Sequence, residues 1–192
     1  MELIDIINKA NSLEGIYLDL GFGKGKDARQ IYSLMLENKI KSRDFILVDL
    51  FQGGDKGIWQ KAYDLCNEVK NRLKRTGVYI TTDVRKEKLN ITQPIALVTV
   101  DIEDGTEHAL NQILPLVKKG GVVLLKNYNS NSSESIDNTK YSYLADHINK
   151  ALQNTNSTPK VVSNKDYSYI IRDELVRPVI KTKVKRTQSI LT

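Results

Sequence analysis

The sequence Tyr17-Leu-Asp-Leu-Gly-Phe-Gly-Lys-Gly25 decides the fold, because an apolar strand with an acid near its end runs directly into a glycine-rich turn. Glycine adopts backbone conformations that are closed to other residues, and it lets a ligand approach the main chain closely. The residues that follow Gly25 are expected to begin a helix whose first amide groups face the same ligand. This order of strand, turn and helix predicts a cofactor site.

The charge beside the turn narrows the class of cofactor. The spacing Gly23-x-Gly25-x-x-Ala28 also fits the dinucleotide fingerprint, so the glycines alone leave that alternative open. The carboxylate of Asp19 would be repelled by a pyrophosphate. It would be attracted to an ammonium or sulfonium cation, by about 1 kcal/mol at 4 Å in water and by more when shielded. Because S-adenosylmethionine carries both cations, we expect it to be the cofactor.

Length and composition favour one soluble domain. The chain has 192 residues, enough for one core of ordinary size and too few for two full domains. No apolar run approaches the roughly 20 residues that span a bilayer, and the start lacks the pattern of a signal peptide, so we expect a cytoplasmic protein. The single cysteine, Cys66, excludes an intrachain disulfide, and its place on an apolar helical face predicts a buried thiol.

The positive charge is concentrated at the end of the chain. Residues 177–192 contain five basic residues and no acid, so removing them from the net charge of +6 leaves +1 for residues 1–176. The single domain predicted over 1–176 therefore lacks the broad electrostatic footprint of a nucleic-acid-binding protein. We interpret the basic tail 177–192 as a solvated end or a basic edge strand, with a binding arm as the alternative.

Helical and extended patterns alternate along the domain and predict an α/β fold with a Rossmann-like, doubly wound sheet. Helices are predicted over 3–10, 27–38, 59–76 and 107–118, with a further one ending near 153. Strands are predicted over 15–20, 45–50, 78–82, 95–100 and 121–125. Segments 160–162 and 167–172 are close enough to form an antiparallel pair, and the polar run 129–140 is predicted to be a loop or lid.

These motifs together resemble the class I S-adenosylmethionine-dependent methyltransferases over most of the chain. The likeness rests on the glycine turn, the acid-ended strands Leu47-Val-Asp49 and Val98-Thr-Val-Asp101, the Gly120-Gly121 strand and the closing antiparallel pair. Within that class, three further stretches are similar to the small-molecule O-methyltransferases of the macrocin (TylF) type and their FkbM-like relatives. They are Asp49-Leu-Phe-Gln-Gly53, the segment from Asp101 to His108, and Leu114 to Gly121 with Asn127-Tyr128.

The resemblance implies a set of cofactor-binding residues. Asp49 would accept hydrogen bonds from the ribose hydroxyls, with a helix N-cap as its alternative role. Asp83 would lie at the adenine edge, although a turn or capping role fits it equally. The methionine moiety would be faced by Asp19 and by the backbone of Gly21 and Gly23, and Gly25 is the third cofactor-binding glycine of the turn.

Asp101 is the residue that we expect at the reacting end of the cleft. It ends the fourth predicted strand, next to the switch point where open α/β sheets bind ligands, and Glu103 and Asp104 follow it. A carboxylate there can orient the cofactor's amino group, take a proton from an acceptor hydroxyl or hold a divalent cation. Asp104 and Glu107 have the spacing of a capping box, so we assign them to the start of a helix.

The sequence argues against a magnesium site. The macrocin-type enzymes hold magnesium with paired aspartates after the fifth strand, where this chain has Lys126-Asn127. A protonated lysine cannot ligate a cation and would repel it, so magnesium is doubtful and we assign no metal ligand. His108 could act as a base, but a surface or capping role is more common for a lone histidine at a helix start.

We expect an enzyme that methylates a hydroxyl of a small molecule or a sugar. The first alternative is an RNA ribose 2′-O-methyltransferase of the FtsJ type, whose pattern Asp101, Lys126 and Asp166 would fit. Lys9 is a candidate for that family's remaining lysine, at a shorter distance from the glycine turn than the family has, and the near-neutral domain argues against RNA. On our preferred interpretation Lys126 faces solvent or pairs with a nearby acid. The second alternative is a non-catalytic subunit that binds S-adenosylmethionine.

Overall fold

The computed structural model describes residues 2–50, 56–84, 86–102, 106–126, 160–161 and 167–172. Several predictions fall outside these residues: the basic tail 177–192, the polar run 129–140, the helix ending near 153, and the side chains of Glu103, Asp104 and Asp166.

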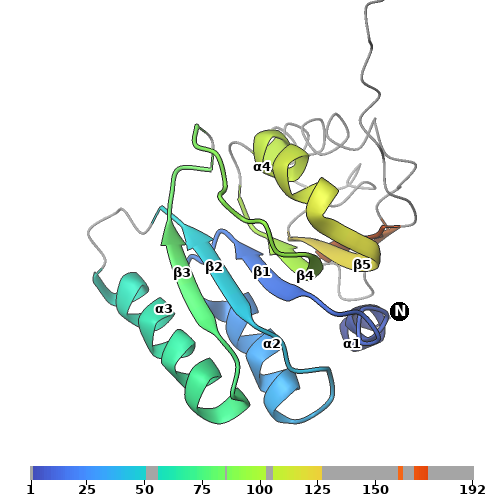
Figure 1. The fold of residues 1–192 in the computed structure, drawn as a ribbon, viewed down its shortest axis with the longest axis horizontal. Coiled ribbons are helices and arrows are strands. Elements are labelled where there is room, and N and C mark those ends of the chain that lie inside the picture. Colours follow the sequence, from blue (N-terminus) through green and yellow to red (C-terminus); the bar gives the residue numbers. More distant parts are fainter. Residues whose placement is uncertain are drawn as a thin grey trace, which may run out of the picture.

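The described strands form a seven-stranded sheet with the order β3-β2-β1-β4-β5-β7-β6 (Figure 1). The strands are β1 (Ile16–Leu20), β2 (Phe45–Asp49), β3 (Gly77–Thr81), β4 (Ile95–Val100), β5 (Val117–Lys126), β6 (Lys160–Val161) and β7 (Tyr167–Ile171). Strands β1 to β5 are parallel, whereas β7 is antiparallel to both β5 and β6. The predicted parallel sheet with an antiparallel C-terminal pair is therefore confirmed.

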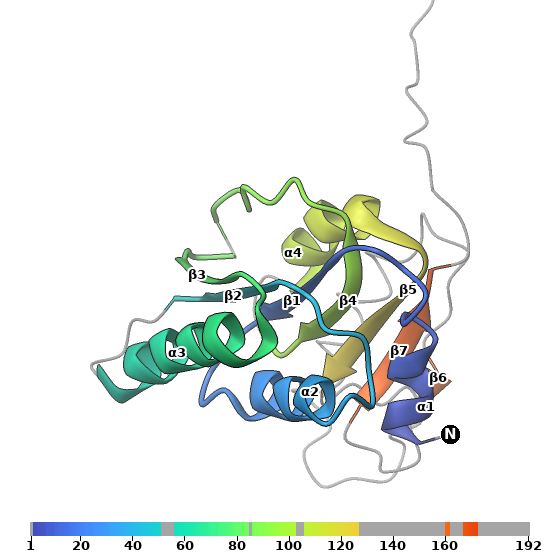
Figure 2. The same cartoon turned by 60° about the horizontal axis from the view of Figure 1, so that its bottom comes forward.

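Helices cover both faces of the sheet, which confirms the doubly wound arrangement. Figure 2 shows α2 (Lys26–Leu36) and α3 (Lys56–Glu68) on one face and α4 (Thr106–Ile113) on the other. Helix α1 (Leu3–Asn8) packs into the same apolar cluster as α2 and α3, and α4 packs into a second cluster on the opposite side. Strands β1 and β4 are buried along their whole length because helices cover them on both sides.

Two helix boundaries differ from the prediction. Helix α3 continues into a π-helical segment, Val69–Leu73, as part of the long helix expected there. The helix predicted over 107–118 was too long, because α4 ends at Ile113 and a 3₁₀ turn, Leu114–Leu116, leads into β5. Pro115 lacks an N–H and its ring disfavours the α conformation in the preceding residue, which explains the early end. Lys118 consequently lies in a strand.

Two further observations bear on the predictions from composition. Cys66 is buried on the inner face of α3, and burial raises the pKa of its thiol to about 11, so the prediction of a buried thiol is confirmed. Within the described ranges, no helix is both long enough and apolar enough to cross a membrane.

A buried arginine ties the connection between α1 and β1 to the start of β2. The guanidinium of Arg43 donates hydrogen bonds to the carbonyl oxygens of Ala10 at 2.5 Å, Leu13 at 2.7 Å and Gly15 at 3.4 Å. Because Arg43 precedes β2, these contacts place Ala10 and the end of α1 at the amino-terminal edge of the strands.

Replacing Arg43 by alanine is therefore expected to destabilise the fold. The three carbonyl groups would lose their donor, and at about 1 kcal/mol for each hydrogen bond the free energy of unfolding should fall by about 3 kcal/mol. Urea unfolding followed by circular dichroism measures this change. Arg75→Ala is the control, because among the described residues this exposed side chain donates only to the Ser42 hydroxyl, at 3.2 Å, and its loss should change stability by less than about 0.5 kcal/mol. Equal effects of the two substitutions would contradict the role of Arg43.

Candidate cofactor and active site

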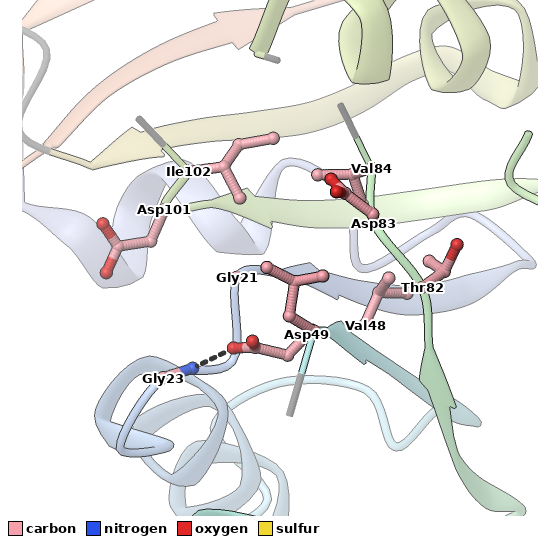
Figure 3. A pocket seen from close by; sticks show the side chains of 10 residues that line it. Gly21, Gly23, Val48, Asp49, Thr82, Asp83, Val84, Asp101 and Ile102 are labelled. Atoms are coloured by element: carbon pink, nitrogen blue, oxygen red, sulfur yellow. Dashed lines mark hydrogen bonds between the residues drawn. The ribbon is translucent and has the colours of Figure 1, made fainter. Parts of the chain in front are cut away.

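A cavity of about 340 Å³ opens at the carboxyl ends of β1, β2, β3 and β4 (Figure 3). This position is the topological switch point of the sheet, because the chain proceeds outward from β1 in one direction and from β4 in the other. The lining consists of Gly21, Gly23, Val48, Asp49, Leu50, Thr82, Asp83, Val84, Asp101 and Ile102. A cavity of this size, mostly apolar with a few carboxylates, is typical of a small-molecule or cofactor site.

The glycines of the turn serve different structural purposes. Gly21 has a φ of +86°, and a Cβ atom there would lie 2.1 Å from the carbonyl oxygen of Asp101, so the packing of the turn on the end of β4 requires glycine. Gly25 is the N-cap of α2, and a Cβ atom there would clash with the ring of Phe22. Gly23 differs, because a Cβ atom there would come no nearer than 3.9 Å to the Gly21 carbonyl oxygen, its nearest contact. The main chain at Gly23 is thus open to the cavity.

Asp49 joins the end of β2 to the glycine turn. Its Oδ2 atom accepts a hydrogen bond of 2.6 Å from the backbone N–H of Gly23, shown as the dashed line in Figure 3. Asp83 lies beyond the end of β3 on another part of the wall, with its carboxylate 3.8 Å from the ammonium of Lys86. The cavity therefore has one carboxylate fixed against its glycine turn and a second at the end of the neighbouring strand.

Asp19 lies beneath the turn and is not among the residues that line the cavity. Its side chain is 2% exposed, and its Oδ1 atom accepts hydrogen bonds from the Tyr17 hydroxyl at 3.0 Å and from the Thr99 hydroxyl. The Oδ2 atom has no hydrogen-bond partner within the described part of the chain. Burial raises the pKa of Asp19 from 3.8 to about 7, and the charges of Asp27 and Asp101 act in the same direction.

Lys126 connects the end of β5 to two acids. Its ammonium lies 2.6 Å from Asp27 and 3.2 Å from Asp101, so the expected pairing with an acid after β4 is found. Tyr167, the β7 partner of Lys126 in the strand register, donates a hydrogen bond to the other oxygen of Asp27. Burial alone would lower the pKa of Lys126, but the hydrogen bond to Asp27 and the charge of Asp101 outweigh it and raise that pKa.

Asp27 and Tyr167 were not predicted as site residues. Asp27 follows the glycine turn directly and was assigned only to the start of a helix, although its place in the first turn of α2 brings it to the carboxyl edge of the sheet. Tyr167 is brought there by the antiparallel pairing of β7 with β5. The cavity brings together Gly21, Gly23, Asp49, Asp83 and Asp101, whereas Asp19, Gly25 and Lys126 do not line it.

The structure does not bring Lys9 to this site. Lys9 is the C-cap of α1, next to Ala10, whose carbonyl is held at the amino-terminal edge of the sheet. Asp101 and Lys126 lie at the carboxyl edge, and a five-residue strand separates the two edges by roughly 17 Å. His108 is exposed on α4. Among the described residues, no group of three or more His, Cys, Asp or Glu side chains could hold a metal ion.

The sheet order with its antiparallel β7 is that of a Rossmann-like fold, and methyltransferases of known structure share this fold. CalS11, a TDP-rhamnose 3′-O-methyltransferase of calicheamicin biosynthesis, matches with a TM-score of 0.68 and 17% identity over 89% of this chain and 77% of its own. The S-adenosylhomocysteine-bound methyltransferase PaMTH1 of Podospora anserina matches with a TM-score of 0.60 and 13% identity over 88% and 76%. An rRNA methylase of Streptococcus thermophilus matches with a TM-score of 0.57 and 13% identity over 89% and 94%.

At these identities the likeness establishes the fold. Comparison of the sequence with protein-family models and with curated proteins gives no match.

The raised pKa of Asp19 predicts a specific dependence of stability on pH. Between pH 3.8 and about 7 the folded state keeps a proton that the unfolded chain has released. The contribution of Asp19 to stability should therefore be greatest below about pH 4, fall by about 1.4 kcal/mol per pH unit as the pH rises toward 7, and fall no further above it.

Asp19→Asn removes this titration. The difference in unfolding free energy between the variant and the wild type should therefore change by about 1.4 kcal/mol per pH unit below pH 7. Urea unfolding at about pH 5, 6, 7 and 8 measures the difference. A difference that is the same at every pH would show that Asp19 does not titrate in this range.

Proposed function

We propose that this protein is an S-adenosylmethionine-dependent methyltransferase. The observation that carries the proposal is the cavity at the β1/β4 switch point, where the open main chain of Gly23 and the carboxylate of Asp49 meet on one wall. A ligand with a ribose and a cationic amino-acid end fits this combination. The hydroxyls of the ribose need an acceptor, and the cation favours an acidic surrounding.

The sheet favours this cofactor over a dinucleotide. The usual dinucleotide-binding order is 3-2-1-4-5-6 with parallel strands. Here the antiparallel β7 takes the place beside β5 where that order has its sixth parallel strand. The overall fold is shared with the methyltransferases of known structure that match this chain, one of which binds S-adenosylhomocysteine.

In this proposal, different residues of the cavity bind different parts of the cofactor. Asp49 would exchange its hydrogen bond from Gly23 for bonds from the ribose hydroxyls, and Asp83 would meet the adenine edge. The methionine end would lie against the turn formed by Gly21, Gly23 and Gly25, above the buried Asp19. The bound cofactor supplies an electrophilic methyl group on a sulfonium, so the protein's own tasks are alignment, exclusion of water and removal of a proton.

Asp101 is the proposed proton acceptor. It lines the cavity at the end of β4, and its carboxylate can take the proton of an acceptor hydroxyl as the oxygen attacks. Lys126 holds this carboxylate in place from β5 and is itself held by Asp27, to which Tyr167 also donates. Because an ammonium already lies beside Asp101, we propose that the reaction needs no magnesium.

We propose that the acceptor is a hydroxyl of a small molecule or a sugar, in the manner of the macrocin-type enzymes. Lys126 pairs with two acids, Asp27 and Asp101. Lys9 lies at the other edge of the sheet, so the set of lysines expected of an RNA ribose methyltransferase is incomplete among the described residues. The contact between Lys126 and Asp101 and the matched rRNA methylase favour RNA as the second candidate. A non-catalytic subunit would bind the cofactor and lack turnover.

Calorimetric titration with S-adenosylhomocysteine tests the cofactor. We expect binding that is tighter than that of NAD. Asp49→Ala should weaken it by about 1 to 3 kcal/mol, because a charge-assisted pair of hydrogen bonds to the ribose is lost. Asp64→Ala, which changes an exposed acid of α3 paired with Gln60, should leave the affinity unchanged. If the protein binds NAD tightly and binds neither S-adenosylmethionine nor S-adenosylhomocysteine, the methyltransferase proposal is refuted.

Lys126→Ala separates the two acceptor classes. If Lys126 only holds Asp101, the variant should keep turnover within about tenfold of the wild type on a small hydroxyl acceptor, with cofactor affinity nearly unchanged. If the ammonium lowers the pKa of an attacking ribose hydroxyl, turnover on RNA should be abolished while the cofactor still binds. A screen of acceptors with radiolabelled cofactor measures this, with thermal melting to verify the fold. Methyl transfer to RNA that requires Lys126 would establish the RNA alternative.

A further inference from the structure

Three buried polar groups form a closed triangle beneath the glycine turn. Oδ1 of Asp19 is 3.0 Å from the Tyr17 hydroxyl and also contacts the Thr99 hydroxyl, and the two hydroxyl oxygens are 2.8 Å apart. Tyr17 is fully buried, and Asp19 and Thr99 are each 2% exposed. Asp19 and Thr99 are direct neighbours in the register of β1 and β4, so the sheet itself holds the triangle together.

The triangle has three oxygen–oxygen contacts but only two hydroxyl protons to form hydrogen bonds. A tyrosine and a threonine hydroxyl donate one proton each, and an ionised carboxylate donates none. If Asp19 is ionised, both hydroxyls point at its Oδ1 atom and their own contact of 2.8 Å brings together two oxygens without a proton between them. A third proton, carried by Oδ1, gives each of the three contacts a donor, because Oδ1 then donates to one hydroxyl and accepts from the other. The geometry therefore favours a neutral Asp19.

The surroundings of Asp19 act in the same direction. Its Oδ2 atom is buried without a hydrogen-bond partner in the described part of the chain, which is costly for an ionised group. The acids that face it are Asp27 from α2 and Asp101 from the end of β4, and both raise its pKa. Lys126 is paired with those two acids. Burial, the largest cause, raises the pKa of Asp19 to about 7.

The cofactor proposed above would change this balance. Asp19 is two residues before Gly21, whose backbone lines the cavity, and two residues of extended chain span about 7 Å. A cation bound against the turn in a site with little water stabilises a negative charge at that separation. The attraction between the cation and an ionised Asp19 would then outweigh the free energy lost when the contact between the two hydroxyls has no proton.

We propose that Asp19 is a neutral carboxylic acid in the cofactor-free protein and releases its proton when the cationic methionine end of the cofactor binds at the glycine turn. Tyr17 and Thr99 are its positioning residues, because their hydroxyls fix Oδ1 and can both donate to the carboxylate after the proton has left. The proton passes to the solvent, so cofactor binding is linked to pH. This inference rests on the proposed binding of S-adenosylmethionine.

Calorimetric titration with S-adenosylmethionine, which carries the sulfonium and the ammonium, between about pH 5.5 and 8 in two buffers with different ionisation enthalpies measures the linkage. The affinity should rise up to about tenfold per pH unit below pH 7 and level off above it, with release of close to one proton at the acid end. In Asp19→Asn the contribution of Asp19 should be absent, so the proton release at the acid end should fall by close to one proton, and any exchange that remains in the variant comes from the ligand.

Substitution of the positioning residues should move the midpoint of this pH dependence. Tyr17→Phe and Thr99→Val each remove a donor that stabilises the carboxylate, so the midpoint should shift to higher pH while the affinity at high pH is largely kept. A merely structural role would lower the affinity equally at every pH. Tyr32→Phe is the matched control: this tyrosine of α2 is also buried but is no part of the triangle, and the midpoint should stay where it is.

Infrared difference spectra provide a direct readout. Addition of S-adenosylmethionine at about pH 6 should remove the carbonyl stretch of a protonated carboxylic acid in the wild type and not in Asp19→Asn. Binding with constant affinity and no proton release would overturn this inference while leaving the proposed function intact. Release that is as large in Asp19→Asn as in the wild type would also overturn it. Failure of the wild type to bind at any pH would overturn the proposed function itself.

Discussion

The close packing of Gly21 on the backbone of Asp101 is the constraint on which the site depends. The N–H of Asp101 donates to the Leu20 carbonyl at 2.8 Å, and the N–H of Gly21 donates to the Val48 carbonyl at 2.9 Å. The ends of β1, β2 and β4 are thereby joined at one point. Since no side chain fits at Gly21, the turn packs closely against the ends of the strands. The space above the turn remains as the cavity.

The acids at this edge of the sheet differ in how their charges are compensated. Asp27 and Asp101 share the ammonium of Lys126 at the carboxyl ends of β4 and β5. Asp49 accepts from a backbone amide of the turn. Asp19 has only hydroxyl donors on one oxygen, and no described cation contacts it. The site therefore combines compensated acids on its wall with one acid beneath the turn whose charge depends on what is bound.

Much of the fold could be predicted from the sequence because its signals are local. Buried strands read as apolar runs, the glycine turn marks the end of β1, and Asp49 and Asp101 mark the ends of β2 and β4. The end of α4 was misjudged because the apolar spacing continues past Ile113, while Pro115 turns the chain into β5. The part played by Asp27 was missed because it depends on Lys126 and Tyr167, which lie 99 and 140 residues further along the chain.

Asp19 shows why the pattern of a motif does not fix the state of its residues. The sequence around the turn places an acid two residues before Gly21, and from that spacing a carboxylate facing the ligand was expected. One of its two hydrogen-bond donors is Thr99, which lies 80 residues away and meets it through the pairing of β1 with β4. An apolar residue at position 99 would leave the motif intact and change the proton affinity of the acid within it. The chemistry of the turn is thus set jointly by the local sequence, which supplies the carboxyl group, and by the sheet, which supplies its donors.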